Sequence, residues 1–139
     1  MGKIVALDIG SRRTGIAETD DMQLIASPLT TVATHELMPY LENHFKKNKV
    51  DLVVFGDPKT LSGDENEGSA VKKDMLERFQ RRFPAMPFEN QDERFTSKMA
   101  LDAQIAGGMK KSKRKEKGSL DVIAACLILQ SYLESRKWQ

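Results

Sequence analysis

The sequence predicts an α/β protein with a mixed sheet, and three observations support this prediction. Residues 3–9 and 50–56 are apolar runs rich in β-branched side chains, as in strands that are buried on both faces. Segments that follow them repeat apolar residues at the spacing of amphipathic helices. Three strands come first, and then helices alternate with single strands, which is typical of one layered domain. We therefore expect a single domain over 1–139.

The composition is that of an ordinary globular protein of 139 residues, with 40% hydrophobic and 30% charged residues. The 22 basic and 20 acidic side chains give a net charge of +2, so any nucleic-acid surface must arise from local clustering. A single cysteine excludes an intramolecular disulfide and a thiolate zinc site. No apolar run approaches the about 20 residues of a membrane span, and no signal peptide is recognisable, so we expect a cytoplasmic protein.

The first half is predicted to hold three strands and one helix. Residues 3–9 and 15–20 flank a tight polar connection and should pair as antiparallel strands, and 23–32 should form a third strand with Pro28 at an edge. Thr34 is a candidate N-cap for the helix. The apolar stripe of that helix is Leu37, Tyr40, Leu41, His44 and Phe45. We expect the histidine to pack there rather than to bind a ligand.

The second half begins with the buried strand 50–56 and continues into residues 56–70, which lack apolar periodicity. Loops of this length in a compact domain are often functional. A helix should follow, with these inward positions: Val71, Met75, Leu76, Phe79 and Phe83. A short strand is predicted over 87–95, then a helix capped by Thr96 or Ser97, and a last helix capped by Ser119.

Acidic residues occur where the predicted elements begin or end. Asp8 ends the first strand, Asp92 and Glu93 end the late strand, and Asp121 lies in the first turn of the last helix. Side chains converge at strand ends in an open α/β sheet. Three or four oxygen ligands without histidine or cysteine suit Mg²⁺ or Mn²⁺. Two such ions about 4 Å apart can activate water and stabilise the leaving oxygen of a phosphodiester.

Each acid also has a purely structural interpretation. Asp8 alone fits a turn-forming role equally well. Asp92 and Glu93 point to opposite faces if the strand continues, so one of them would then be a surface or salt-bridge residue. Asp121 alone is better explained by the positive end of the helix dipole. The joint placement of the acids favours a functional site.

Five stretches taken together resemble the YqgF/RuvX family: ALDIGSRRTGIA, SPLTT, DLVVFGDP…SG, DERFTS and K…SLDVIAACLILQSYL. They extend over nearly the whole chain in the order and spacing of that family. The resemblance implies an RNase H-like fold with a mixed central sheet of about five strands flanked by helices. Members are related to Holliday-junction resolvases, and are described as junction resolvases and as nucleases that mature the 5′ end of pre-16S rRNA.

The resemblance also implies a set of metal ligands, namely Asp8, an acid of the DER segment and Asp121. Within that segment we prefer Glu93, and Asp92 stays open as the alternative. The number of ions, one or two, is likewise open. The chain departs from the family at Asp57, because an apolar residue usually follows the loop glycine there.

Basic residues beside these acids are the candidate contacts to nucleic acid. Arg12 and Arg13 follow the first acid, and Arg94 follows the acidic pair. The densest basic run contains Lys110, Lys111, Lys113, Arg114, Lys115 and Lys117. The structural alternatives are a hairpin tip for the first two arginines and a solvated connector for the run. No aromatic residue is interleaved with the run, which favours recognition of backbone and shape over base stacking.

The sequence therefore predicts a metal-dependent endonuclease acting on structured RNA or branched DNA. Processing of pre-16S rRNA is preferred, and Holliday-junction resolution is the alternative. A non-catalytic nucleic-acid-binding module would use the same basic run. An actin-like or sugar-kinase ATPase also starts with strand, aspartate, glycine and loop, but it needs a second such domain, for which 139 residues are too few. Both a monomer and a homodimer are compatible with the sequence.

Overall fold

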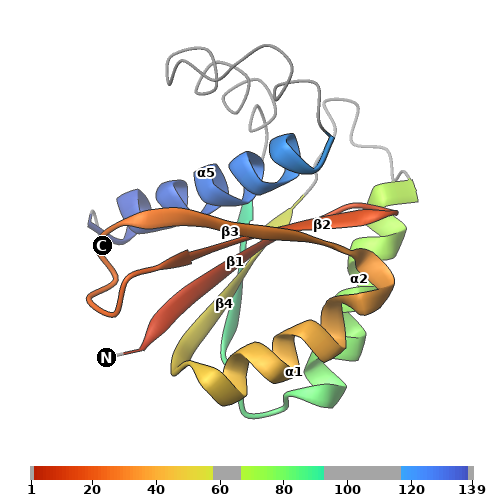
Figure 1. Ribbon diagram of the computed structural model, residues 1–139, viewed down its shortest axis with the longest axis horizontal. Coiled ribbons are helices and arrows are strands. Elements are labelled where there is room, and N and C mark those ends of the chain that lie inside the picture. The colour runs from red at the N-terminus through yellow and green to blue at the C-terminus, as the bar shows by residue number, and fades with distance from the viewer. Residues whose placement is uncertain (1, 58–66, 93–116, 138–139) are drawn as a thin grey trace.

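The computed structural model describes residues 2–57, 67–92 and 117–137 (Figure 1). They contain a five-stranded mixed sheet with the strand order β3-β2-β1-β4-β5. The strands are β1 (Lys3–Ile9), β2 (Arg13–Thr19), β3 (Ala26–Ala33), β4 (Val50–Asp57) and β5 (Phe88–Asp92). The central strand β1 pairs antiparallel with β2 and parallel with β4, and β3 and β5 extend the sheet on either side.

Helices cover both faces of the sheet (Figure 1). The helices α1 (Leu37–Lys47) and α2 (Glu67–Arg82) lie on one face, and α5 (Lys117–Lys137) lies on the other. In the described ranges, no helix combines the length and apolar character needed to cross a membrane. The predicted α/β class, with a mixed sheet of about five strands flanked by helices, is confirmed.

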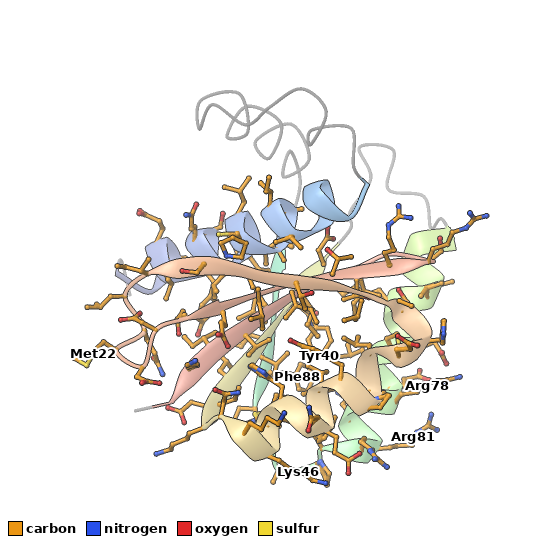
Figure 2. All side chains as sticks on the ribbon, in the orientation of Figure 1. Met22, Tyr40, Lys46, Arg78, Arg81 and Phe88 are labelled. Atoms are coloured by element: carbon orange, nitrogen blue, oxygen red, sulfur yellow. The ribbon has the colours of Figure 1, made fainter. Side chains whose placement is uncertain are left out.

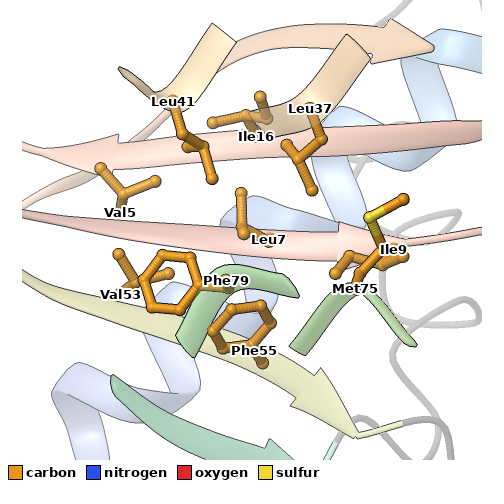
Figure 3. Close-up of a cluster of buried hydrophobic side chains, with 10 residues drawn as sticks. All are labelled: Val5, Leu7, Ile9, Ile16, Leu37, Leu41, Val53, Phe55, Met75 and Phe79. Atoms are coloured by element: carbon orange, nitrogen blue, oxygen red, sulfur yellow. The ribbon is translucent and has the colours of Figure 1, made fainter. Parts of the chain in front are cut away.

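The face covered by α1 and α2 holds a core of large side chains, drawn in Figure 3. Its fully buried members include Leu7 from β1, Leu37 from α1 and Phe79 from α2. The rings of Phe55 and Phe79 meet edge to face with their centroids 5.2 Å apart, which is a favourable aromatic geometry. The stripe predicted for α1 is confirmed, because its apolar residues belong to this core or pack against it.

The face covered by α5 holds a core of smaller side chains. Its buried members are Ile4, Ala6, Ala17, Val54, Ala125, Ile128 and Leu129. Three of the seven are alanines, which let the helix backbone come close to the strands. Because side chains alternate along a strand, each of β1, β2 and β4 serves both cores at once.

Several predicted boundaries are wrong by two to four residues. The third strand begins at Ala26, not at Gln23, because Gln23 adopts φ 58° within a turn. The last helix begins at Lys117, two residues before the predicted cap at Ser119. The helix α2 begins at Glu67, so its first residues come from the segment predicted as loop.

The predicted helix cap at Thr34 is also wrong. A single 3-10 turn, Thr34–Glu36, precedes α1, and the residue at its N-cap position is Ala33. The Thr34 hydroxyl instead donates to the carbonyl of Gly10 at 2.7 Å, and its oxygen lies 3.0 Å from the Thr14 hydroxyl. The side chain therefore connects β3 to the turn after β1.

The packed role predicted for His44 is confirmed. Its Nε2 lies 2.9 Å from a carboxylate oxygen of Glu18 on β2, and its ring stacks on Tyr40. Burial, followed by the nearby negative charge of Glu18, raises the pKa of the Tyr40 hydroxyl. This cluster fixes α1 to the sheet.

Candidate functional site

The carboxyl ends of three parallel strands meet at one edge of the sheet. Asp8 is the penultimate residue of β1, and Asp57 and Asp92 are the last residues of β4 and β5. The two terminal aspartates are direct partners in the parallel register. The first residues of α5 lie toward this same edge (Figure 1). We call this end of the sheet the acidic edge.

The side chain of Asp8 belongs to the face covered by α5. Ile4 and Ala6, which precede it at intervals of two, are both buried against that helix. Ile9 and the other odd-numbered residues of β1 face the opposite core. Ile4, Ala6 and Asp8 thus form a series of β1 residues on the face toward α5, which we call the α5-facing series. Asp8 is half-buried and is the residue of this series at which the apolar contacts end.

Glycines occupy both positions beside Asp8 on the neighbouring strands. Gly15 is its direct partner on β2. On β4, Gly56 follows Phe55, which is the partner of Leu7, so Gly56 stands next to Asp8 on the other side. Both glycines are buried. Neither glycine therefore places a Cβ atom beside Asp8 on the neighbouring strands.

Hydrogen bonds fix the turn that follows Asp8. The amide of Gly10 donates to the carbonyl of Arg13 at 2.9 Å, and a Cβ on Gly10 would lie only 2.9 Å from that oxygen. The Thr34 amide donates to the Arg12 carbonyl at 2.9 Å, alongside the bond from its hydroxyl to Gly10. The turn therefore has one defined backbone conformation. Sequence reasoning missed this role of Thr34, because a threonine before a helix favours a cap.

Arg12 and Arg13 lie on this turn, close to Asp8 in the chain and at the same edge. Arg12 is exposed and Arg13 is partly exposed. Their guanidinium groups supply positive charge beside a carboxylate, which suits a phosphate-binding edge. The other predicted basic contacts are Arg94, Lys110, Lys111, Lys113, Arg114 and Lys115, all outside the described residues, and Lys117, which is the first residue of α5.

The expected position of Asp121 is wrong in one respect. Because α5 begins at Lys117, Asp121 is its fifth residue, and no acidic residue occurs in the first turn. An interaction with the helix dipole falls off within the first turn, so this structural explanation of Asp121 loses support. Glu93 lies outside the described residues, and for Asp92 and Asp121 the structure gives the backbone position.

Lys72 is a charged residue that sequence reasoning did not single out. It is only 8% exposed, although lysine is rarely buried without a partner. It lies about one turn before Met75 in α2, and Figure 3 shows Met75 beside Ile9 at the end of β1. Lys72 is therefore a buried cation in the first half of α2, on the face of the sheet opposite α5.

Within the described ranges, no three histidine, cysteine, aspartate or glutamate side chains lie close enough to hold a metal ion, and the candidate ligand Glu93 lies outside those ranges. Catalysis by a cysteine nucleophile is an alternative to metal chemistry. Cys126 on α5 is half-buried, and burial raises the pKa of its thiol. A thiol with a raised pKa is a poor nucleophile at neutral pH, so cysteine catalysis is not indicated.

Comparison with known proteins identifies related chains over nearly the full length. The family model described as "RuvX: Holliday junction resolvase" matches residues 2–135. A protein of Christiangramia forsetii named "Putative pre-16S rRNA nuclease" is 47% identical over 133 residues, which are 96% of this chain and 98% of the relative. A protein of the same name from Flavobacterium johnsoniae is 44% identical over 138 residues, covering 99% of this chain and all of the relative.

Solved structures resemble this fold at low sequence identity. "T. thermophilus RuvC in complex with Holliday junction substrate" matches with a TM-score of 0.61 and 12% identity, covering 99% of this chain and 96% of that one. A second Thermus thermophilus RuvC structure matches with a TM-score of 0.55 and 15% identity, covering 98% and 96%. These similarities confirm the RNase H-like fold that the family resemblance implies.

Proposed function

The chain belongs to the RuvX family, and we propose that it is a metal-dependent endonuclease that hydrolyses phosphodiester bonds in structured nucleic acid. One observation carries this proposal above the others. Asp8 ends the α5-facing series of β1 at the acidic edge, with glycines beside it on both neighbouring strands. A carboxylate in that position, without neighbouring side chains on β2 and β4, is suited to meet a cation and a phosphate group.

The acids of this edge fit a divalent metal ion by their chemistry. Asp8, Glu93 and Asp121 would hold Mg²⁺ or Mn²⁺, with Asp92 as the alternative to Glu93, because carboxylate oxygens are the ligands that these ions prefer. The placement of Asp8 and the backbone positions of Asp92 and Asp121 at one edge support this set. When bound, such an ion stabilises negative charge on the phosphate and lowers the pKa of a coordinated water.

The side chains of the protein have separate tasks in this proposal. The Asp8 carboxylate would hold the metal ion. Arg12 and Arg13 contact phosphates beside the scissile one, from a turn that Thr34 holds in place. The basic run before Asp121, together with Arg94, would extend the phosphate contacts and make binding sensitive to salt.

We propose precursor 16S rRNA as the substrate, with cleavage at its 5′ end. The names and near-complete coverage of relatives 44–47% identical to this chain support this choice. Such a substrate would place the protein in the cytoplasm. The description of the family model supports the alternative, resolution of a Holliday junction. A nucleic-acid-binding module without catalysis is the alternative of another class.

A parallel cleavage assay separates these possibilities. The wild type, Asp8→Asn and the control Asp74→Asn are incubated with a pre-16S leader and with a four-way DNA junction, over a Mg²⁺ titration. The control makes the same chemical change at an exposed α2 acid that pairs with Arg78. We expect leader cleavage that needs Mg²⁺ and that falls about 100-fold or more in Asp8→Asn, since a metal site supplies several kcal/mol of transition-state stabilisation.

Other outcomes of this assay would redirect the proposal. Preferential cutting of the junction would favour the resolvase alternative. Binding to both substrates without cleavage at any Mg²⁺ concentration would favour the non-catalytic module. Cleavage that is equally fast in Asp8→Asn would remove Asp8 from the mechanism.

A further inference from the structure

The turn between β2 and β3 exposes a group of large apolar side chains. Met22, Leu24 and Ile25 keep 62%, 70% and 65% of their surface exposed, and they are the exposed large hydrophobic residues of the described chain. Figure 2 shows Met22 projecting outward from this turn. Isolated apolar residues on a surface are ordinary, whereas a contiguous protruding group marks an interaction site. We call these three residues the apolar tip.

Hydrogen bonds hold the apolar tip in its exposed conformation. Gln23 adopts φ 58°, a left-handed conformation that is costly for a residue with a side chain. Its Nε2 donates to the Gly2 carbonyl at 2.6 Å, so Gln23 points inward while its neighbours point out. The Asp20 carboxylate accepts from the amides of Leu24 and Ile25 at 2.8 and 3.0 Å. The exposure is therefore a defined feature of the fold.

An apolar groove lies beside the apolar tip, at the same end of the sheet. It has a volume of about 530 Å³ and lies between the start of β4 and the connection from α2 to β5. The residues lining this groove are Val50, Asp51, Arg82, Phe83, Pro84, Ala85, Met86 and Pro87. Asp51 links the two features, because its carboxylate accepts from the Gly2 amide at 2.7 Å and from Gln23 at 3.3 Å.

We propose that two copies of this chain form a two-fold symmetric dimer, in which the apolar tip of each copy occupies the groove of the other. The charges beside the two surfaces are complementary. Asp20 and Asp21 flank the tip. Arg82 lines the groove, where it also pairs with Glu42, and the exposed Lys49 directly precedes the groove residue Val50. A reciprocal contact covers both apolar surfaces of both copies and closes the assembly, as the commonest protein dimers do.

A second copy fits these surfaces better than nucleic acid does. The aspartates at the tip would repel phosphates, and the tip lies at the amino ends of the parallel strands, opposite the acidic edge. The proposed dimer therefore leaves both acidic edges accessible. It does not depend on the function proposed above, because it rests on a different end of the molecule.

The first test measures the mass of the full chain in solution across a wide range of concentrations. We expect the wild type to reach the mass of a dimer as concentration rises, and Leu24→Asp to remain a monomer with an unchanged circular dichroism spectrum. The matched control, Lys73→Asp, adds the same residue at an exposed position of α2 and should dimerise like the wild type. A wild type that stays monomeric throughout would overturn the proposal.

The second test identifies which surfaces meet. In a Cys126→Ser background, chains carrying Leu24→Cys are mixed with chains carrying Ala85→Cys under mild oxidation. We expect a disulfide-linked dimer at least tenfold faster in the mixture than in either variant alone, because tip and groove cysteines come together only across the interface. Equal cross-linking within the Leu24→Cys variant alone would indicate contact between two tips, and no cross-linking in the mixture would equally exclude the proposed contact.

Discussion

The two faces of the sheet bury similar lengths of strand with different kinds of side chain. The face under α1 and α2 is filled by bulky residues such as Leu7, Phe55 and Phe79. The face under α5 is built on alanines, and it ends at Asp8 with a glycine on either side. Large side chains on one face supply stability, whereas on the other face small residues and glycines surround Asp8. Substitutions can separate these two contributions.

The largest expected effect is on the bulky face. Phe79→Ala should lower the free energy of unfolding by about 3–5 kcal/mol, because it removes a fully buried ring and leaves a cavity. Urea denaturation followed by circular dichroism measures the change. Cleavage per folded molecule should stay close to that of the wild type at low temperature. A loss of less than about 1 kcal/mol would show that this core repacks around the gap.

On the other face, a single methyl group should affect activity more than stability. Gly15→Ala places a Cβ opposite Asp8, where directly paired residues have Cβ atoms about 5 Å apart. We expect cleavage to fall about tenfold to 100-fold, since small displacements of a reacting site can cost that much. The control Ile16→Val removes one methyl group from the opposite core and should leave the turnover number intact. Equal turnover in Gly15→Ala and the wild type would argue against the crowding of Asp8.

A smaller effect is expected where β3 meets the turn after Asp8. Thr34→Val keeps the shape of the side chain but removes the donor to the Gly10 carbonyl and the partner of Thr14. We expect a loss of about 1–3 kcal/mol in unfolding free energy, because buried polar groups are left unsatisfied. Thr30→Val on the preceding edge strand β3 is the matched control, and its loss should be clearly smaller. Equal losses would mean that the Thr34 network contributes little.

The smallest expected effect concerns pH and the turn that carries the apolar tip. Hydrogen bonds from the amides of Ile25 and Leu24 hold the pKa of the Asp20 carboxyl below its ordinary value of 3.8. Because the folded pKa is the lower one, these bonds stabilise the turn above about pH 4 and are lost as pH falls through the folded value. The NMR shifts of both amides should follow this titration. In Asp20→Asn the same shifts should stay flat, and a titration there would assign the effect to another group.

Sequence patterns predicted the parts of the fold that depend on local periodicity. The runs 3–9 and 50–56 are strands, and the apolar stripe of α1 faces the core. Patterns failed where a distant or unusual contact decides the conformation. The apolar residues of 23–32 favour a strand, and nothing in this stretch indicates that Gln23 adopts a positive φ within a turn. Ser119 before an apolar repeat resembles a helix N-cap, although α5 begins two residues earlier, at Lys117.

The same distinction applies to the acidic edge. Asp8 could be picked out from the sequence, because a carboxylate after an apolar run is unusual. Its neighbour on β2, Gly15, follows from a local hairpin between β1 and β2. Gly56 becomes a neighbour of Asp8 only through the parallel pairing of β1 with β4. Parallel registers join segments far apart in the chain, and local pattern carries no information about them. Lys72 was missed for a related reason, since only packing shows that it is buried.

The position of α5 has a consequence for the order in which the protein assembles during synthesis. This helix is the last element of the described chain, yet it covers β1 and β2, which are among the first to be made. The face that contains Ile4 and Ala17 is therefore shielded from water only after α5 has been made. Nascent chains can pack the α1 and α2 face early, but the contribution of α5 to the acidic edge comes only after that helix has been made.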